Sequence, residues 1–447
     1  MKDDDPTPSR SRRAFVRSAV AAGASAALVG CLEDGTTLKA PDGVEAPSSL
    51  PDRQHAWDDA LPEDRDGNVS PPEHHVFLSL SLSAEPDETA RETVRTALRE
   101  VERAIEWGPD GVLFTLGYTP AYFDRFDAPL DDAVDLPEPE PILALTAESD
   151  VTVDTNDALL HLASDDGAAV LAVEQALFGE RERLNGRSLS TSLEDVFDRT
   201  ARRTGFVGPG LPADRQDGLE GIPDGEPVPE EAPFFMGFRS GFRESQATED
   251  RVTIREGPFA GGSTQHFETL ELDLEVWYDE SDHEQRVARL FSPAHAEREA
   301  VGEVGERLGT ETGVASVAAD IHDHARDDGV VGHAQKLARA RDDGTPTLLR
   351  RDVNTTDDDV CGVHFVSLQR EMSEFTRVRE AMLGEEFGQY GLGPRQGNGI
   401  LRYLRVRRWG SYLVPPRPRR ALPRPAPDGE RRKADGAPEE KDGSDDG

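Results

Sequence analysis

Cysteine is nearly absent from this chain, and apolar residues are few. Only Cys31 and Cys361 occur among 447 residues. If Cys31 belongs to a processed signal, as argued below, one thiol remains, which excludes a disulfide framework and a zinc site built from several thiolates. Apolar residues make up only 36% of the chain. They recur in periodic blocks, however, so we expect a packed core.

Basic charge is also scarce. The chain has 50 Lys and Arg against 88 Asp and Glu, a formal net charge of -38, and lysine is much rarer than arginine. Such a surface repels itself in dilute buffer. In concentrated salt the repulsion is screened, because the Debye length falls to about 3 Å at 1 M. We interpret the excess acid as adaptation to high salt, and it argues against nucleic acid as a partner.

The N-terminus carries an arginine pair and a weakly apolar segment. Arg12 and Arg13 precede residues 14–30, which are too short and too weakly apolar for a comfortable membrane span, and Cys31 follows. The arrangement resembles a twin-arginine export signal with a lipobox. We expect residues 1–31 to be this signal and Cys31 to be lipidated. The protein would then lie on the outer face of the cell membrane, held only by a lipid anchor. The alternative is a poor transmembrane anchor or a chance arginine pair.

Residues 32–72 are rich in Pro, Asp and Gly and are predicted to form a disordered tether. Alternating and helical periodicity then predicts the elements of a first half, residues 73–206. These are strands over 75–82, 111–118, 142–145 and 158–164, and helices over 87–106 and 167–178. The order β-α-β followed by β-α is typical of a ferredoxin-like unit. His74 and His75 border the first strand and are expected to be solvated.

An acidic Gly/Pro loop, 207–233, separates this half from a second one, residues 234–390. Its predicted elements are strands over 264–276 and 362–368 and helices over 281–291 and 373–383. We expect an irregular tail over 391–447, disordered from Pro415 onward. The predicted fold is therefore α+β, with two tandem ferredoxin-like units whose antiparallel sheets pack as in the dimeric α+β barrel superfamily.

Four segments of the second half stand in a characteristic order. They are Gly237-Phe238-Arg239-Ser240-Gly241, the glycine turn 257–263, Gly332-His333 with Leu349-Arg350-Arg351 after it, and strand 362–368 with Gln369-Arg370. In this order and spacing the chain resembles the dye-decolorizing peroxidase family, over roughly residues 75–385. That family consists of haem proteins with two ferredoxin-like halves, and many members carry twin-arginine signals.

The resemblance implies one haem b per chain, with His333 as the axial iron ligand. Gly237, Gly241 and Gly262 would frame the cofactor. The distal arginine falls on the pair Arg350 and Arg351, of which we favour Arg350. The aspartate that carries the peroxide proton in the family is replaced by Ser240. A hydroxyl cannot accept a proton near neutrality as a carboxylate does.

The resemblance further implies reduction of hydrogen peroxide with an organic electron donor, and a homo-oligomer is possible. Iron, an axial donor and a distal cation have candidates, but the proton carrier is missing from its usual place. Arg239 and Glu244 would replace it only by rearrangement. Three interpretations therefore stay open: a slow peroxidase, a non-catalytic haem-binding or structural protein, and a scaffold without cofactor.

A hypothesis from another class rests on the pair His322 and His324. A His-x-His pair can bind zinc or copper, so the chain could instead be an exported metal-binding or substrate-binding lipoprotein. No third histidine or carboxylate has an obvious spacing to this pair. His266 is expected to contact a sheet neighbour. The glycine turn 257–262 lacks the Lys-Ser/Thr of a P-loop and is interpreted as a tight turn.

Overall fold

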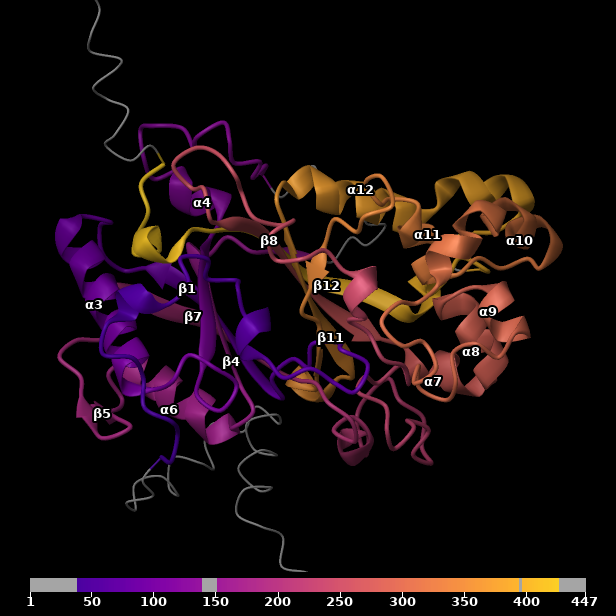
Figure 1. Cartoon of the computed structure of the whole chain (residues 1–447), viewed down its shortest axis with the longest axis horizontal. Coiled ribbons are helices and arrows are strands. Elements are labelled where there is room, and N and C mark those ends of the chain that lie inside the picture. Colours follow the sequence, from indigo (N-terminus) through magenta and orange to yellow (C-terminus); the bar gives the residue numbers. More distant parts are fainter. Residues whose placement is uncertain (1–37, 139–150, 394–395, 426–447) are drawn as a thin grey trace, which may run out of the picture.

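The computed structural model describes residues 38–138, 151–393 and 396–425. Arg12, Arg13, Cys31 and the strand predicted over 142–145 lie outside these residues. Within them, the first half is a four-stranded antiparallel sheet in the order β7-β1-β4-β2 with helices on one face (Figure 1). Its elements are β1 (His74–Leu82), α3 (Glu88–Ala104), β2 (Leu113–Tyr118), α4 (Pro120–Phe123), β4 (Ala158–Ser164), α6 (Gly167–Leu177) and β7 (Phe197–Phe206).

The second half repeats this arrangement in the order β12-β8-β11-β10. In both halves the fourth, first, third and second long strands lie side by side, which is the ferredoxin-like order. Its strands are β8 (Ser263–Leu272), β10 (Val353–Thr355), β11 (Gly362–Gln369) and β12 (Leu404–Val414). Its helices are α7 (Leu274–Asp279), α8 (His283–Leu290), α9 (Pro293–Glu297), α10 (Ile321–Asp327), α11 (His333–Ala338) and α12 (Met372–Leu383).

The two sheets close into one barrel through two narrow seams. Tyr118 of β2 pairs with Leu413 of β12, and Phe206 of β7 pairs with Asn354 of β10. Minor strands lie beside it: β3 (Thr152–Val153) is parallel to β12, β9 (Leu349–Arg350) pairs with β11, and β5 (Arg183–Leu184) pairs with β6 (Arg187–Ser188). The predicted α+β fold of two ferredoxin-like units is confirmed, with the barrel as the way in which they pack.

Alternation along the strands separates two cores. Val76, Leu78 and Leu80 of β1 face outward and pack under α3 and α6. Phe77 faces inward with Phe267 and Tyr412. His75, which we expected to be solvated, is also buried, and its Nδ1 lies 2.9 Å from Nε2 of His161. His74 is buried as well, and the prediction for both histidines was wrong because they already belong to β1, which pairs with β4 on one side and with β7 on the other.

Two element boundaries differ from the expectation for physical reasons. The strand predicted to reach Val276 ends at Leu272, because the Asp273 side chain accepts a hydrogen bond from the Val276 N–H and caps α7. The alternation continued into α7 because Leu274 and Trp277 are buried on one side of that helix. By contrast, α3 begins where expected, with Asp87 accepting from the Ala90 N–H.

The predicted tether and tail are ordered wherever the structure describes them. The tail predicted to be irregular over 391–447 contains β12, which pairs with β8, so the second half extends beyond residue 390. Residues 38–72 pack on the barrel, with Trp57 only 1% exposed. Residues 415–425 run over the first half, where the Tyr122 hydroxyl donates to the Pro423 carbonyl at 2.9 Å. Arg420 lies 2.7 Å from Glu102. Composition alone suggested disorder, but each segment gains partners from distant parts of the chain.

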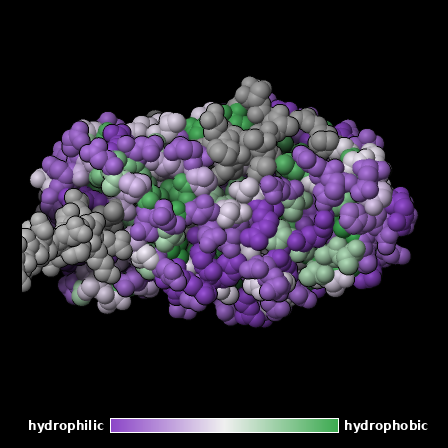
Figure 2. Space-filling view, turned by 90° about the horizontal axis from the view of Figure 1, so that it is seen from above, coloured by the Kyte–Doolittle hydropathy of each residue, from purple (hydrophilic) through white to green (hydrophobic). Residues whose placement is uncertain are grey.

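Hydrophilic residues dominate the face seen in Figure 2, in line with the strongly acidic composition. None of the helices in the described ranges is long and apolar enough to cross a membrane.

Candidate functional site

The largest difference between the halves creates a cavity. In the first half, α3 alone connects the first two long strands, whereas five helices, α7 to α11, connect β8 to β10. Side chains from α8, α11 and α12 and from the outer faces of β8 and β11 line an inner cavity of about 200 Å³. Most of its walls are apolar and aromatic, including Phe238, Phe291, Leu337, Phe365 and Phe375. Such walls suit a mainly apolar ligand.

His333 is the first residue of α11 and lines this cavity. Gly332 before it lets α11 approach α8, since a Cβ there would lie 1.8 Å from the Phe291 carbonyl oxygen. Burial, and then the positive charge of Lys336 and nearby arginines, holds the pKa of His333 well below its ordinary value. The imidazole is therefore neutral at pH 7. Its Nδ1 is buried and has no hydrogen-bond partner among the described residues.

Arg350 and Arg351 point to different places. Arg350, on β9, lines the same inner cavity as His333, and its backbone N–H donates to Gln246 Oε1 at 2.7 Å. Arg351 is 8% exposed. Its guanidinium lies 2.9 Å from Glu249 and 4.2 Å from the ring centre of Trp57. Only Arg350 of the pair therefore shares a cavity with His333.

The other predicted residues of the motif do not all line the inner cavity. Ser240 lines the inner cavity. Gly241, with φ +80°, lines only an outer cavity described below. Gly237 has φ +87° and Gly262 would place a Cβ 2.6 Å from the Val414 carbonyl oxygen, but neither lines the inner cavity. These two glycines shape turns, whereas we expected them to frame a cofactor.

Two carboxyl groups that were not predicted from the sequence, those of Glu268 and Asp352, also line the inner cavity. Glu268 is 1% exposed and forms an ion pair with Arg379. Burial opposes its ionisation, but Arg379 and then His266 outweigh burial and lower its pKa. Asp352 differs: burial raises its pKa to about 6, although Arg350 acts in the opposite direction. The position of Asp352 two residues after Arg350 was the available signal in the sequence.

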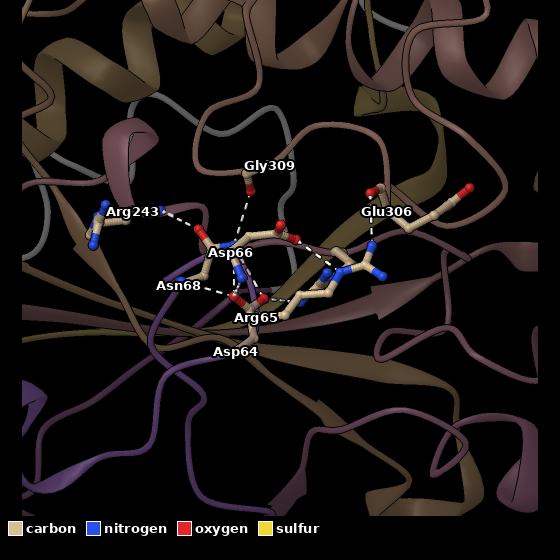
Figure 3. A network of polar contacts seen from close by, with 8 residues as sticks. Asp64, Arg65, Asp66, Asn68, Arg243, Glu306 and Gly309 are labelled. Carbon is tan, nitrogen blue, oxygen red and sulfur yellow. Dashed lines mark hydrogen bonds and ion pairs between the residues drawn. The ribbon is translucent and has the colours of Figure 1, made fainter.

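An outer cavity of about 400 Å³ adjoins the inner one, and Ser240, Arg350 and Asp352 line both. Residues 61–71 of the supposed tether form part of its wall. In Figure 3, Asp64 accepts hydrogen bonds from the backbone of Asp66 and Asn68, and the Asn68 side chain donates to the Gly309 carbonyl at 2.9 Å. The N-terminal segment is thereby attached to the second half at the mouth of the site.

The alternative site at His322 and His324 is not assembled. His324 Nδ1 is 2.9 Å from the Gln335 amide nitrogen, while His322 packs against Phe387 and Tyr390. Within the described ranges there is no group of three or more His, Cys, Asp or Glu placed to hold a metal ion. As expected, His266 contacts a sheet neighbour, Trp409 of β12, at 4.4 Å between ring centres, and it also stacks on Phe375 of α12 at 3.8 Å.

Comparison with solved structures defines the class of the fold. The ferric form of DtpA from Streptomyces lividans is similar over 86% of this chain and 95% of DtpA, with 15% sequence identity and a TM-score of 0.53. Its oxyferrous/water mixed complex gives 16% identity, 84% and 94% coverage and the same TM-score. A dye-decolorizing protein from V. cholerae matches with 12% identity, 82% and 99% coverage and a TM-score of 0.47.

At these sequence identities the likeness shows that this chain shares a fold with the DtpA structures, and it shows nothing more. Residues 72–416 match the profile of the family of unknown function DUF7405, and the chain belongs to that family. No curated protein matches the sequence.

Proposed function

We propose that this chain binds haem in the inner cavity and reduces hydrogen peroxide with an organic electron donor. One observation supports this most directly: a neutral histidine, His333, and the cation Arg350 line the same mainly apolar cavity. The unpartnered Nδ1 of His333 and the aromatic walls fit an iron porphyrin, which requires an imidazole donor and apolar contact. The DtpA structures, one of them ferric, support an iron-binding use of this fold.

Bound haem would supply the redox-active iron at which the peroxide O–O bond is cleaved. His333 would hold that iron, because its neutral imidazole has a lone pair available. Arg350 would stabilise negative charge on the departing peroxide oxygen. The apolar walls around Phe238 and Phe375 exclude water and so strengthen this interaction. The outer cavity gives peroxide a route to Arg350.

Ser240 favours a second candidate function, a haem-binding protein without peroxidase activity. Ser240 stands where the dye-decolorizing peroxidase family has its aspartate, and a hydroxyl cannot accept a proton near neutrality. The two candidates share the haem and differ in turnover, so one preparation distinguishes them.

We also propose that residues 1–31 direct export by the twin-arginine route and that Cys31 is lipidated, with the acidic surface adapted to high salt. The support is the sequence pattern and the net charge of -38. Labelling with a fatty-acid analogue, compared between wild type and Cys31→Ser, tests the lipid anchor. Equal labelling of both proteins would contradict it.

The decisive experiment is a visible spectrum of the full chain, reconstituted with haem in high salt. We expect a Soret band that His333→Ala abolishes and that the matched control His322→Ala retains. Peroxide-dependent oxidation of a dye then separates an enzyme from a binder. Absence of bound haem in the wild type would overturn the proposal, and loss of the band in His322→Ala alone would overturn the assignment of His333.

A further inference from the structure

The proposed reaction requires a group that moves the peroxide proton, and the sequence motif offers only Ser240. Glu244, the acid closest to the motif, does not line the inner cavity, and its carboxylate accepts a hydrogen bond from Thr310 at 2.8 Å. Arg239 is ion-paired with Asp64. A guanidinium also remains protonated and cannot take up a proton. Neither residue therefore replaces the missing acid.

Only two carboxyl groups line the inner cavity within the described ranges, Glu268 and Asp352. Glu268 is committed to the ion pair with Arg379, which keeps it ionised. Asp352 is half-buried and lines both cavities beside Arg350 and Ser240. The Val366 N–H donates to its Oδ1 at 3.3 Å, which fixes the carboxyl group at the start of β10. Asp352 thus lies between the entry route and the space beside Arg350.

We propose that Asp352 is the proton carrier of this site and takes over the task left by the serine in the motif. This inference rests on the proposed function. The Asp352 carboxylate accepts a proton from one peroxide oxygen and returns it to the other oxygen as the O–O bond breaks, so that this oxygen leaves as water. Overall, hydrogen peroxide, two protons and two electrons from the organic donor give two waters. The carboxyl group ends in its starting protonation state.

The electrostatic surroundings agree with this role. Burial raises the pKa of Asp352 to about 6 and Glu268 adds to the rise, while Arg350 and the Val366 N–H lower it. The charged and titratable groups that line the inner cavity with it are Arg239, Arg350, Arg379, Glu268 and His333. A carboxyl group that titrates near the working pH is the most effective proton carrier, because it is available both as acid and as base.

The test uses haem-loaded full-length wild type, Asp352→Asn and the control Glu385→Gln, which alters an exposed carboxylate that lines neither cavity. Cyanide binding is followed by the Soret shift from pH 4 to 9. Hydrogen cyanide must give up its proton to bind as the anion, so this measurement reports the base independently of turnover. We expect the wild-type association rate to change with an inflection near pH 6, and Asp352→Asn to lose the inflection.

We also expect kcat/KM for peroxide to fall about 100-fold or more in Asp352→Asn, the range typical of general acid–base groups. Asp352→Glu should restore part of the loss, and Glu385→Gln should leave both measurements unchanged. An unaltered inflection and peroxide rate in haem-loaded Asp352→Asn would overturn the inference while leaving the proposed function standing. A wild-type chain that binds no haem would overturn both.

Discussion

The Gln54 side chain forms two hydrogen bonds with the backbone of Leu116, as a neighbouring strand would. The Leu116 N–H donates to Gln54 Oε1 at 3.0 Å, and Gln54 Nε2 donates to the Leu116 carbonyl at 3.1 Å. The same nitrogen also donates to the Pro415 carbonyl at 2.8 Å. Leu116 is in β2 and Pro415 follows β12, so one buried amide bridges the seam at which the two halves pair only through Tyr118 and Leu413.

Gln54→Ala should destabilise the protein by about 1–3 kcal/mol, because it leaves buried backbone groups of Leu116 and Pro415 without partners. Denaturant unfolding in high salt measures the change. The matched control is Gln389→Ala, which removes an exposed amide and should change the free energy of unfolding by less than about 0.5 kcal/mol. Equal effects of the two substitutions would show that the seam does not depend on Gln54.

Asp64 gives a prediction about acid stability. Burial alone would raise its pKa, but hydrogen bonds from Asn68 and Asp66 and the Arg239 guanidinium lower it to about 2 (Figure 3). A carboxyl whose pKa is lower in the folded state stabilises the protein above its unfolded pKa of 3.8 and loses that effect as pH falls through 2. Asp64→Asn should therefore cost about 2 kcal/mol at pH 7.

The difference between wild type and Asp64→Asn should narrow as the pH falls from about 4 towards 2, measured by denaturant unfolding at each pH. Asp59→Asn, which removes an exposed carboxylate from the same segment, serves as the control and should show little difference at any pH. A constant Asp64→Asn deficit across this range would contradict a role through ionisation.

Salt should stabilise the fold strongly. The formal net charge of -38 repels itself over a Debye length of about 10 Å at 0.1 M salt and about 3 Å at 1 M. We expect the unfolding midpoint temperature to rise steadily from 0.1 to 2 M KCl. A neutral osmolyte at equal osmolality should reproduce little of this rise at low salt. A midpoint that does not depend on KCl would refute high-salt adaptation.

Much of the fold could be predicted from the periodicity of apolar residues. Where this prediction failed, the failure has a physical cause. Strand 158–164 is a short apolar run that is buried throughout, and helix α3 combines strong periodicity with the Asp87 cap, so both could be predicted from the sequence. Residues 38–72 and 415–425 lack periodicity. Their order comes from contacts with residues far away along the chain, such as Gln54 with Pro415, which no local pattern records.

The candidate site likewise has residues that the sequence predicts and a residue whose place only the structure shows. His333 and Arg350 follow a sequence motif, and the structure places both on one cavity. Asp352 carries no motif, and its significance appears only because β10 begins beside β9 and directs it towards the same space. Gly237 and Gly262 belong to the motif, yet they lie in turns outside that cavity, where the backbone leaves little room for a side chain.

The adjacent arginines Arg350 and Arg351 allow a sharp test of the site, because substitution of the first should lower the reaction rate and substitution of the second should lower the stability. Arg350→Gln removes the cation of the inner cavity and should lower the rate of reaction with peroxide about 10²–10³-fold, the range for removal of a charge-stabilising donor. Its stability should change little, because its guanidinium has no ion pair in the described part of the chain. Arg351→Gln removes the cationic partner of the mostly buried Glu249, which keeps only the N–H groups of Trp57 and Asp58, and should cost about 3 kcal/mol of stability. Stopped-flow reaction with peroxide, normalised to bound haem, and denaturant unfolding measure the two effects. A large rate loss in folded, haem-loaded Arg351→Gln together with an active Arg350→Gln would reverse the assignment.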